Sequence, residues 1–148
     1  MRTEATTESE QLARAKAILQ ALDIVQNAAA GIFTQGEQRT AEGRKCVLCI
    51  TGMRQHPDEL FYFVVADGRI QQVRALDRYD TYLKASLDVT LRVLERIWQG
   101  DDGAFVDAKA KYGAVVRGGH PLYDLWAMGQ AFARVAKYLK NYRAAQTL

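Results

Sequence analysis

The hydrophobic pattern of the chain changes its period twice, and this constrains the fold more than any other feature of the sequence. Over Ser9–Ala30 apolar residues recur every three or four positions, which predicts a helix with one apolar stripe. Over Lys45–Leu87 the pattern is that of short strands separated by turns. Helical periodicity then returns in Val89–Gln99 and in Pro121–Tyr142. This succession predicts an α+β domain.

The middle section predicts most of a β-sheet. Four strands are expected, at Lys45–Thr51, Glu59–Ala66, Arg69–Leu76 and Tyr79–Leu87. Asp67-Gly68 is a two-residue turn of the kind that accepts positive φ, and hairpin-length connections predict that these four strands are antiparallel. Tyr112–Arg117 is expected to be a fifth strand. The fold prediction is a five-stranded, mostly antiparallel sheet covered by helices.

The helices after the sheet have clear boundaries and one unusual surface. Asp88 is expected to cap the helix Val89–Gln99, Gly100 to end it, and Ala104–Lys111 to form a short helix. The final helix, Pro121–Tyr142, has an apolar arc of about 200°, roughly twice the minimum for a surface helix. Such a helix should cover the sheet and also contact another helix, a partner subunit or a ligand cavity.

Size and charge narrow the class of protein. The chain has 148 residues, enough for one domain, with a polar segment 1–9 expected to be disordered and a single domain over 10–148. Its apolar runs are too short to span a bilayer, and its start lacks signal-peptide features, so we expect a cytoplasmic protein. A net charge of +3 gives no indication of nucleic-acid binding. Four basic residues of the final helix would favour a transient contact with an anionic membrane surface: Arg134, Lys137, Lys140 and Arg143.

Side chains for catalysis are few. The two histidines, His56 and His120, each stand beside a proline in a predicted turn. Ser9 lies at the edge of the first helix and Ser86 in a strand, so a serine–histidine–acid array would require Ser86 to meet a histidine. We therefore predict no catalytic residues and no enzyme activity.

Side chains for metal binding or redox chemistry are also few. Cys46 and Cys49 stand three apart within a predicted strand, so their side chains point to opposite faces, which favours small buried hydrophobic residues over a redox pair. Asp101, Asp102 and Asp107 are close in sequence but are simply explained as turn and capping residues. No metal site and no cofactor are predicted.

The order of these elements, together with four short segments, resembles the sterol carrier protein type 2 family, also called the sterol-binding domain. The segments are Phe63–Gly68, Leu87–Thr90, Ile97–Asp102 and Gly113–Gly119. The resemblance implies a five-stranded sheet covered on one face by helices. It also implies a hydrophobic tunnel between sheet and helices that takes fatty acids, fatty acyl-CoA, sterols or phospholipids, with no enzymatic chemistry.

Three helices would supply the walls of such a tunnel. The predicted ligand-binding residues are Leu22, Val25, Ile32 and Phe33 near the first helix, Leu91, Leu94 and Trp98 in the middle helix, and Trp126, Met128, Phe132 and Val135 in the last. The predicted function is binding, with or without transfer, of an apolar small molecule or lipid. The alternative is a ligand-free protein-interaction or regulatory module with the same fold, in which the last helix pairs with a partner or forms a homodimer.

Overall fold

The computed structural model describes residues 7–28, 43–66, 69–118, 129–130, 132–134 and 136–137. Its elements are α1 (Glu8–Ala28), β1 (Lys45–Thr51), β2 (Glu59–Ala66), β3 (Arg69–Val73), β4 (Thr81–Ser86), α3 (Leu87–Trp98), α4 (Ala104–Ala110) and β5 (Val115–Gly118). The predicted α+β class is confirmed. A search of the described helices finds none that is long and apolar enough to cross a membrane.

The sheet has the strand order β3-β2-β1-β4-β5. Three neighbouring pairs are antiparallel, namely β2·β3, β1·β2 and β4·β5, so the sheet is mostly antiparallel as predicted. The prediction that the first four strands are all antiparallel is wrong, because β4 pairs with β1 in parallel. The physical reason is the connection from β3 to β4. It runs from residue 74 to 80 and crosses two strands instead of turning back as a hairpin.

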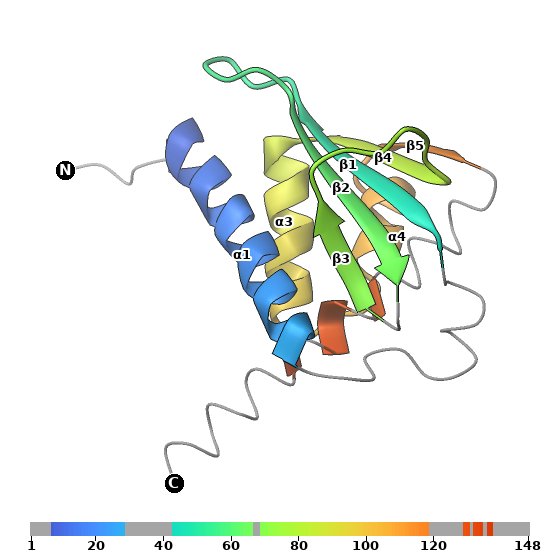
Figure 1. Ribbon diagram of the computed structural model, residues 1–148. Helices are drawn as coiled ribbons and strands as arrows, with labels where there is room; N and C mark the ends of the chain where they lie inside the picture. Colours follow the sequence, from blue (N-terminus) through green and yellow to red (C-terminus); the bar gives the residue numbers. More distant parts are fainter. Residues whose placement is uncertain are drawn as a thin grey trace, which may run out of the picture.

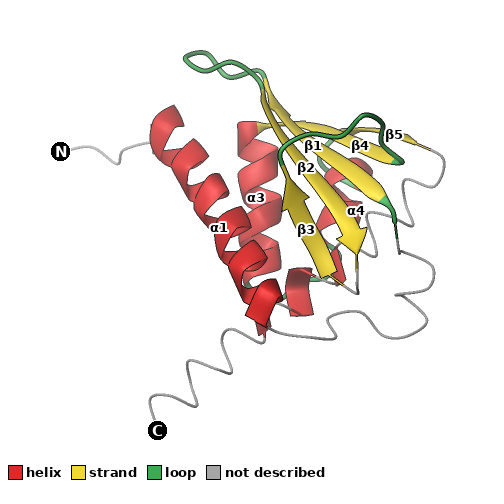
Figure 2. Cartoon of the chain, in the orientation of Figure 1, coloured by secondary structure: helices red, strands yellow, loops and turns green. Residues whose placement is uncertain are grey.

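One face of the sheet carries all three labelled helices. Figure 1 shows α1, α3 and α4 on the same side of the strands, and Figure 2 gives the same arrangement by element type. The strands direct alternate residues toward this layer, as expected for a pleated sheet. From β1, Leu48 and Ile50 join a core that also contains Leu22 of α1 and Leu94 of α3. The apolar stripe predicted for the first helix is buried: Leu12, Ala15, Ile18, Leu19 and Leu22.

The start of α3 differs from the sequence prediction by two residues. Ser86, not Asp88, is the N-cap: its backbone is extended, and its hydroxyl accepts a hydrogen bond from the Val89 N–H at 3.2 Å. Asp88 lies in the first helical turn, where a carboxylate interacts favourably with the helix dipole. The predicted stop is confirmed, since Gly100 has φ of +91° directly after the C-cap Gln99.

The outer elements agree with the sequence within a few residues. The third strand ends at Val73, before the predicted Leu76, and β5 begins at Val115. In the predicted final helix, residues 129–130, 132–134 and 136–137 are helical. The rest of that helix and the Asp67-Gly68 turn lie outside the described residues.

Candidate functional site

The space between the sheet and two helices holds a small apolar cavity. Nine residues line it: Leu48, Leu83 and Ala85 from the sheet, Val89, Thr90, Val93 and Leu94 from α3, and Phe105 and Ala108 from α4. Its volume is about 10 Å³, room for roughly one water molecule. Among the described residues, the space between the sheet and these helices is therefore nearly filled, and the tunnel stays a prediction.

Thr90 is the single polar side chain of this wall. It is 3% exposed, and its hydroxyl has no hydrogen-bond partner among the described residues. A buried hydroxyl without a partner costs about 1–3 kcal/mol. Such a group calls for an explanation, and one explanation is that the hydroxyl is available to a ligand that carries a donor or an acceptor.

An aromatic cluster closes the space next to the cavity. Phe132 is 2% exposed, and its ring meets that of Phe63 on β2 edge-on, with centroids 5.9 Å apart. On its other side it contacts Phe105 of α4, which lines the cavity, at 6.0 Å. The backbone at Gly129 also lies close to the α3–α4 turn. A Cβ added at Gly129 would collide with the carbonyl oxygen of Asp102. Gly129 and Phe132 are thus packed tightly against the α3–α4 turn and against Phe105 of α4.

The structure places five of the eleven predicted ligand-binding side chains. Leu94 lines the cavity and is fully buried. Phe132 and Leu22 belong to the same core, whereas Leu91 and Trp98 on α3 pack against that core partly buried and do not line the cavity. Outside the described side chains lie the remaining six, namely Val25, Ile32, Phe33, Trp126, Met128 and Val135. The ligand-binding role of all eleven stays a prediction.

Sequence reasoning missed the sheet side of the wall. Leu83 and Ala85 alternate on β4, and the period-2 pattern could have identified the face on which they lie. On α3, Val93 and Leu94 share the buried side with Thr90, at helical spacing. The prediction drew the wall from helices alone, although a sheet face opposite them must supply the other half.

A polar cluster at the end of α3 supports the turn role predicted for the acidic residues. The Arg96 guanidinium binds Asp107 at 2.7 Å and Asp101 at 2.6 Å, and it donates to the Tyr112 hydroxyl at 3.0 Å. The hydrogen bond from Arg96 holds the pKa of Asp101 below its usual value. Asp101 also accepts the Gly103 N–H at 3.0 Å. Every partner is internal, so this cluster fixes the α3–α4 turn.

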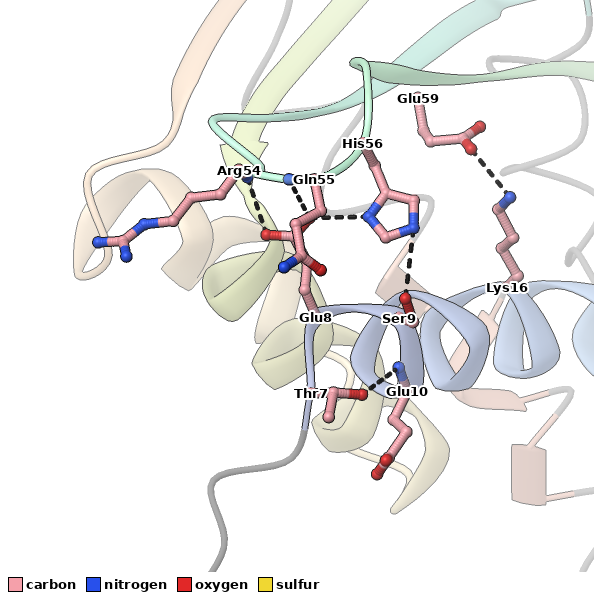
Figure 3. Close-up of polar contacts among 9 residues, drawn as sticks. All are labelled: Thr7, Glu8, Ser9, Glu10, Lys16, Arg54, Gln55, His56 and Glu59. Carbon is pink, nitrogen blue, oxygen red and sulfur yellow. Dashed lines mark hydrogen bonds and ion pairs between the residues drawn. The ribbon is translucent and has the colours of Figure 1, made fainter.

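A second polar cluster joins the start of α1 to the β1–β2 loop (Figure 3). His56 Nδ1 lies 2.7 Å from a Glu8 carboxylate oxygen, and its Nε2 lies 3.5 Å from the Ser9 hydroxyl. The same carboxylate accepts the N–H groups of Arg54 and Gln55, both at 2.8 Å. This contact was not predicted from the sequence, because Glu8 was expected to belong to a disordered segment 1–9, whereas α1 begins at Glu8.

This second cluster has the atom order of a serine–histidine–acid array, but its geometry is that of a structural clamp. A distance of 3.5 Å is the outer limit of a hydrogen bond, so Ser9 is poorly placed to give its proton to His56. Glu8 instead uses its carboxylate to hold the loop backbone. Within the described ranges no three ligating side chains gather into a metal site.

The two cysteines are free and buried. Cys46 belongs to the core on the helix side, and Cys49 stands on the other face of β1, as the strand spacing predicts. There Cys49 forms a hydrogen bond with the Tyr82 side chain, which, together with burial, raises the pKa of Tyr82 to about 12. The cysteines are therefore packed into opposite faces of the sheet.

Comparison with known proteins identifies the fold. No family model matches the chain, and no curated protein matches its sequence. Among solved structures, a "UbiJ-SCP2 Ubiquinone synthesis protein" aligns with a TM-score of 0.53 and 12% identity, covering 91% of this chain and 98% of the other. The sterol carrier protein domain 2 of Helicoverpa armigera aligns with a TM-score of 0.51 and 10% identity, covering 90% and 95%. The predicted resemblance to sterol carrier protein domains is thus confirmed at the level of the fold.

Proposed function

We propose that this protein binds an apolar ligand with one polar group in the space between β1, β4, α3 and α4. The observation that carries the proposal is the unpartnered Thr90 hydroxyl in an otherwise apolar cavity. Ligand sites are mostly apolar, with a few polar groups that orient the ligand. The fold supports the same proposal, because two proteins that share it are named as a sterol carrier domain and a ubiquinone synthesis protein.

A ligand can enter this site only if the cavity widens. A volume of about 10 Å³ is far below that of a fatty acid or sterol, so side chains on one wall must move aside. The Arg96–Asp107 ion pair holds α4 to α3, so the movement that we propose is one of side chains. The Phe105 ring lines the cavity and contacts the Phe132 ring, and it turns away from that ring to admit a ligand. The hydrophobic tunnel of the proposal is the space that opens when these two rings separate.

Filling the cavity tests the proposal directly. Ala108 is fully buried and lines the cavity, whereas Ala110, on the same helix, is exposed. We expect Ala108→Leu to reduce the binding of dansyl-labelled undecanoic acid about tenfold or more, and Ala110→Leu to leave it within twofold. Overpacking costs typically 1–3 kcal/mol, so binding is measured at a temperature where circular dichroism shows both variants folded. Equal affinity of the two variants contradicts the proposed location.

The hydroxyl itself is tested by Thr90→Val, which keeps the shape of the side chain. Removing a buried unpartnered hydroxyl should stabilise the ligand-free protein by about 1–3 kcal/mol. The same change should weaken binding of a fatty acid several-fold, yet leave binding of a hydrocarbon without a polar group unaltered. Equal losses for both ligands would show that Thr90 contributes shape and not a hydrogen bond.

The proposal defines the ligand by its chemistry, an apolar body with a polar group. A fatty acid, a fatty acyl-CoA, a sterol and a phospholipid all fit this description, and an extraction experiment distinguishes them.

The proposed role of this site is to bind a ligand and to transfer it between membranes, without a chemical reaction. We propose that transfer to a membrane uses the basic side chains of Arg134 and Lys137. The rate at which fluorescently labelled ligand passes from the protein to anionic vesicles measures this transfer. The homodimer and the cytoplasmic location stay predictions from the sequence.

A further inference from the structure

The face of the sheet away from the helices carries a second and larger hollow. The β3–β4 connection, residues 74–80, crosses this face, and Figure 2 shows it in green, passing over the strands between β3 and β4. Val73 at the end of β3 is level with Tyr62, Val47 and Tyr82 across the sheet. The ends of the connection are therefore about three strand spacings, or roughly 14 Å, apart. Eight Cα–Cα steps can span about 27 Å, so the chain has length to arch away from the strands.

The arch and the strands enclose a groove of about 440 Å³. Its floor is formed by Val47, Leu60, Tyr62 and Tyr82, which alternate with the core residues of their strands, and its wall by residues 76–79. This volume lies within the range of sites for small molecules, and most of the surface is apolar or aromatic. Leu60 and Tyr79 are each 45% exposed, which is unusual for large apolar residues next to a core.

The groove is held in shape by contacts at one end of the arch. Asp80 N–H donates to the Lys45 carbonyl at 2.7 Å, and the Lys45 N–H donates to the Asp80 carboxylate at 2.9 Å. The Lys45 ammonium also lies 3.5 Å from Asp77. Tyr79 leans on Tyr82 of the floor, with ring centroids 5.4 Å apart. The wall is thus tied to β1 and β4 by both polar and aromatic contacts.

The charges around the groove are unbalanced toward positive. Its acidic residue, Asp77, is paired with Lys45. The Arg78 side chain of the wall forms no ion pair within 4.0 Å among the described residues, although its charge helps to lower the pKa of Asp77. Two more basic side chains on this face, Lys84 of β4 and Arg117 of β5, also form no ion pair with a described residue. The negative charge of Asp58, which acts on Tyr82 of the floor, offsets only one of these three. A ligand that complements this surface has an apolar body and an anionic group near Arg78.

We infer that this groove is a binding site for a small amphipathic anion with a flat aromatic body. The two tyrosines of the floor, Tyr62 and Tyr82, offer ring faces and edges for stacking on a planar group. The Arg78 guanidinium offers a forked donor to a carboxylate or sulfonate. The site is on the opposite face of the sheet from the cavity of the proposed function, so the two can fail independently.

The test uses two ring systems of equal size and opposite charge. We expect 2-naphthoate to bind the full-length protein saturably and to shift the amide resonances of Val47, Tyr62 and Tyr82, and 2-naphthylmethylamine to bind at least fivefold more weakly. Arg78→Glu should weaken naphthoate binding about tenfold, the loss expected for one charged hydrogen bond. Lys109→Glu makes the same change of charge on an exposed α4 position and should alter it less than twofold. Leu60→Glu, which places a carboxylate on the floor, should abolish it.

Several outcomes would overturn the inference. Equal affinity for the two naphthyl compounds removes the anion preference, and equal effects of the Arg78 and Lys109 substitutions remove the role of the wall. Failure of 2-naphthoate to bind contradicts the inference outright, and resonance shifts centred on Val93 and Leu94 place the ligand in the helix-side cavity instead. A doubled mass in light scattering, with the groove amides protected from exchange, makes the face a contact between two copies of the chain. Decanoate, added as a competitor, should leave the naphthoate shifts unchanged if the helix-side cavity is a separate site.

Discussion

Phe132→Ala tests whether the C-terminal helical residues close the cavity by the packing of one ring. Phe132 is 2% exposed and contacts the rings of Phe63 and Phe105. Replacing a buried phenylalanine by alanine costs typically 3–5 kcal/mol, of which each aromatic pair accounts for about 0.5–1.5 kcal/mol beyond its area. For a domain of this size, the loss corresponds to a fall in Tm of roughly 6–20 °C.

The same substitution should create a place for a ligand. An apolar cavity on the order of 150 Å³ stays dry and binds benzene, and the space left by the Phe132 ring adjoins the cavity under Phe105. Benzene at ten times its Kd would then restore about 1.4 kcal/mol of stability to the variant and none to the parent protein.

The measurement is urea unfolding followed by circular dichroism, with and without benzene, on the parent protein, Phe132→Ala and Phe132→Leu. The leucine variant keeps most of the volume, so we expect it to cost less than half as much as alanine, with an unchanged m value for all three proteins. A cost below 1 kcal/mol for Phe132→Ala, or equal effects of benzene on the three proteins, would refute the closing role of this ring.

Three further predictions concern other contacts. The hydrogen bond from His56 lowers the pKa of Glu8. This contact therefore stabilises the fold fully above about pH 4.3, and the stabilisation is lost as the pH falls through the lowered pKa. Glu8→Gln should lower Tm at pH 7, and the difference in Tm between variant and parent protein should shrink toward pH 3. Gly129→Ala should destabilise the protein by about 1–3 kcal/mol in thermal unfolding, because its Cβ meets the Asp102 carbonyl, and a loss below 0.5 kcal/mol would contradict this close approach. Arg96→Gln removes the hydrogen bond that holds the pKa of Asp101 below its usual value, so lowering the pH from 7 to 3 should reduce the Tm of this variant less than that of the parent protein, and an equal reduction would contradict this role.

Periodicity was sufficient to predict the elements but not how they pair. Helix α1, the five described strands and the stop at Gly100 could be predicted because they depend on local patterns of apolar residues and turn chemistry. The parallel pairing of β1 with β4 could not, because it depends on the path of residues 74–80 across the sheet. That path also forms the groove on the outer face, which no local pattern indicates.

The candidate site was predictable to the same degree. The sequence identified Leu94 and Phe132 as apolar residues of helices that face a sheet, and both are buried beside the cavity or in its closing cluster. It did not identify Thr90, because a threonine in a helix acquires significance only when its hydroxyl is buried without a partner. Nor did it bring Glu8 to His56, which lies 48 residues away in the chain.

Native mass spectrometry of freshly purified protein, followed by solvent extraction and identification of what is released, shows whether the protein carries an apolar ligand. We expect a bound apolar molecule with one polar group, such as a fatty acid or phospholipid, at close to one per chain. We also expect Ala108→Leu to lose this molecule and Ala110→Leu to retain it. A ligand-free mass in repeated preparations, with no uptake of added fatty acid or sterol, would contradict the claim and favour a protein-interaction module with the same fold.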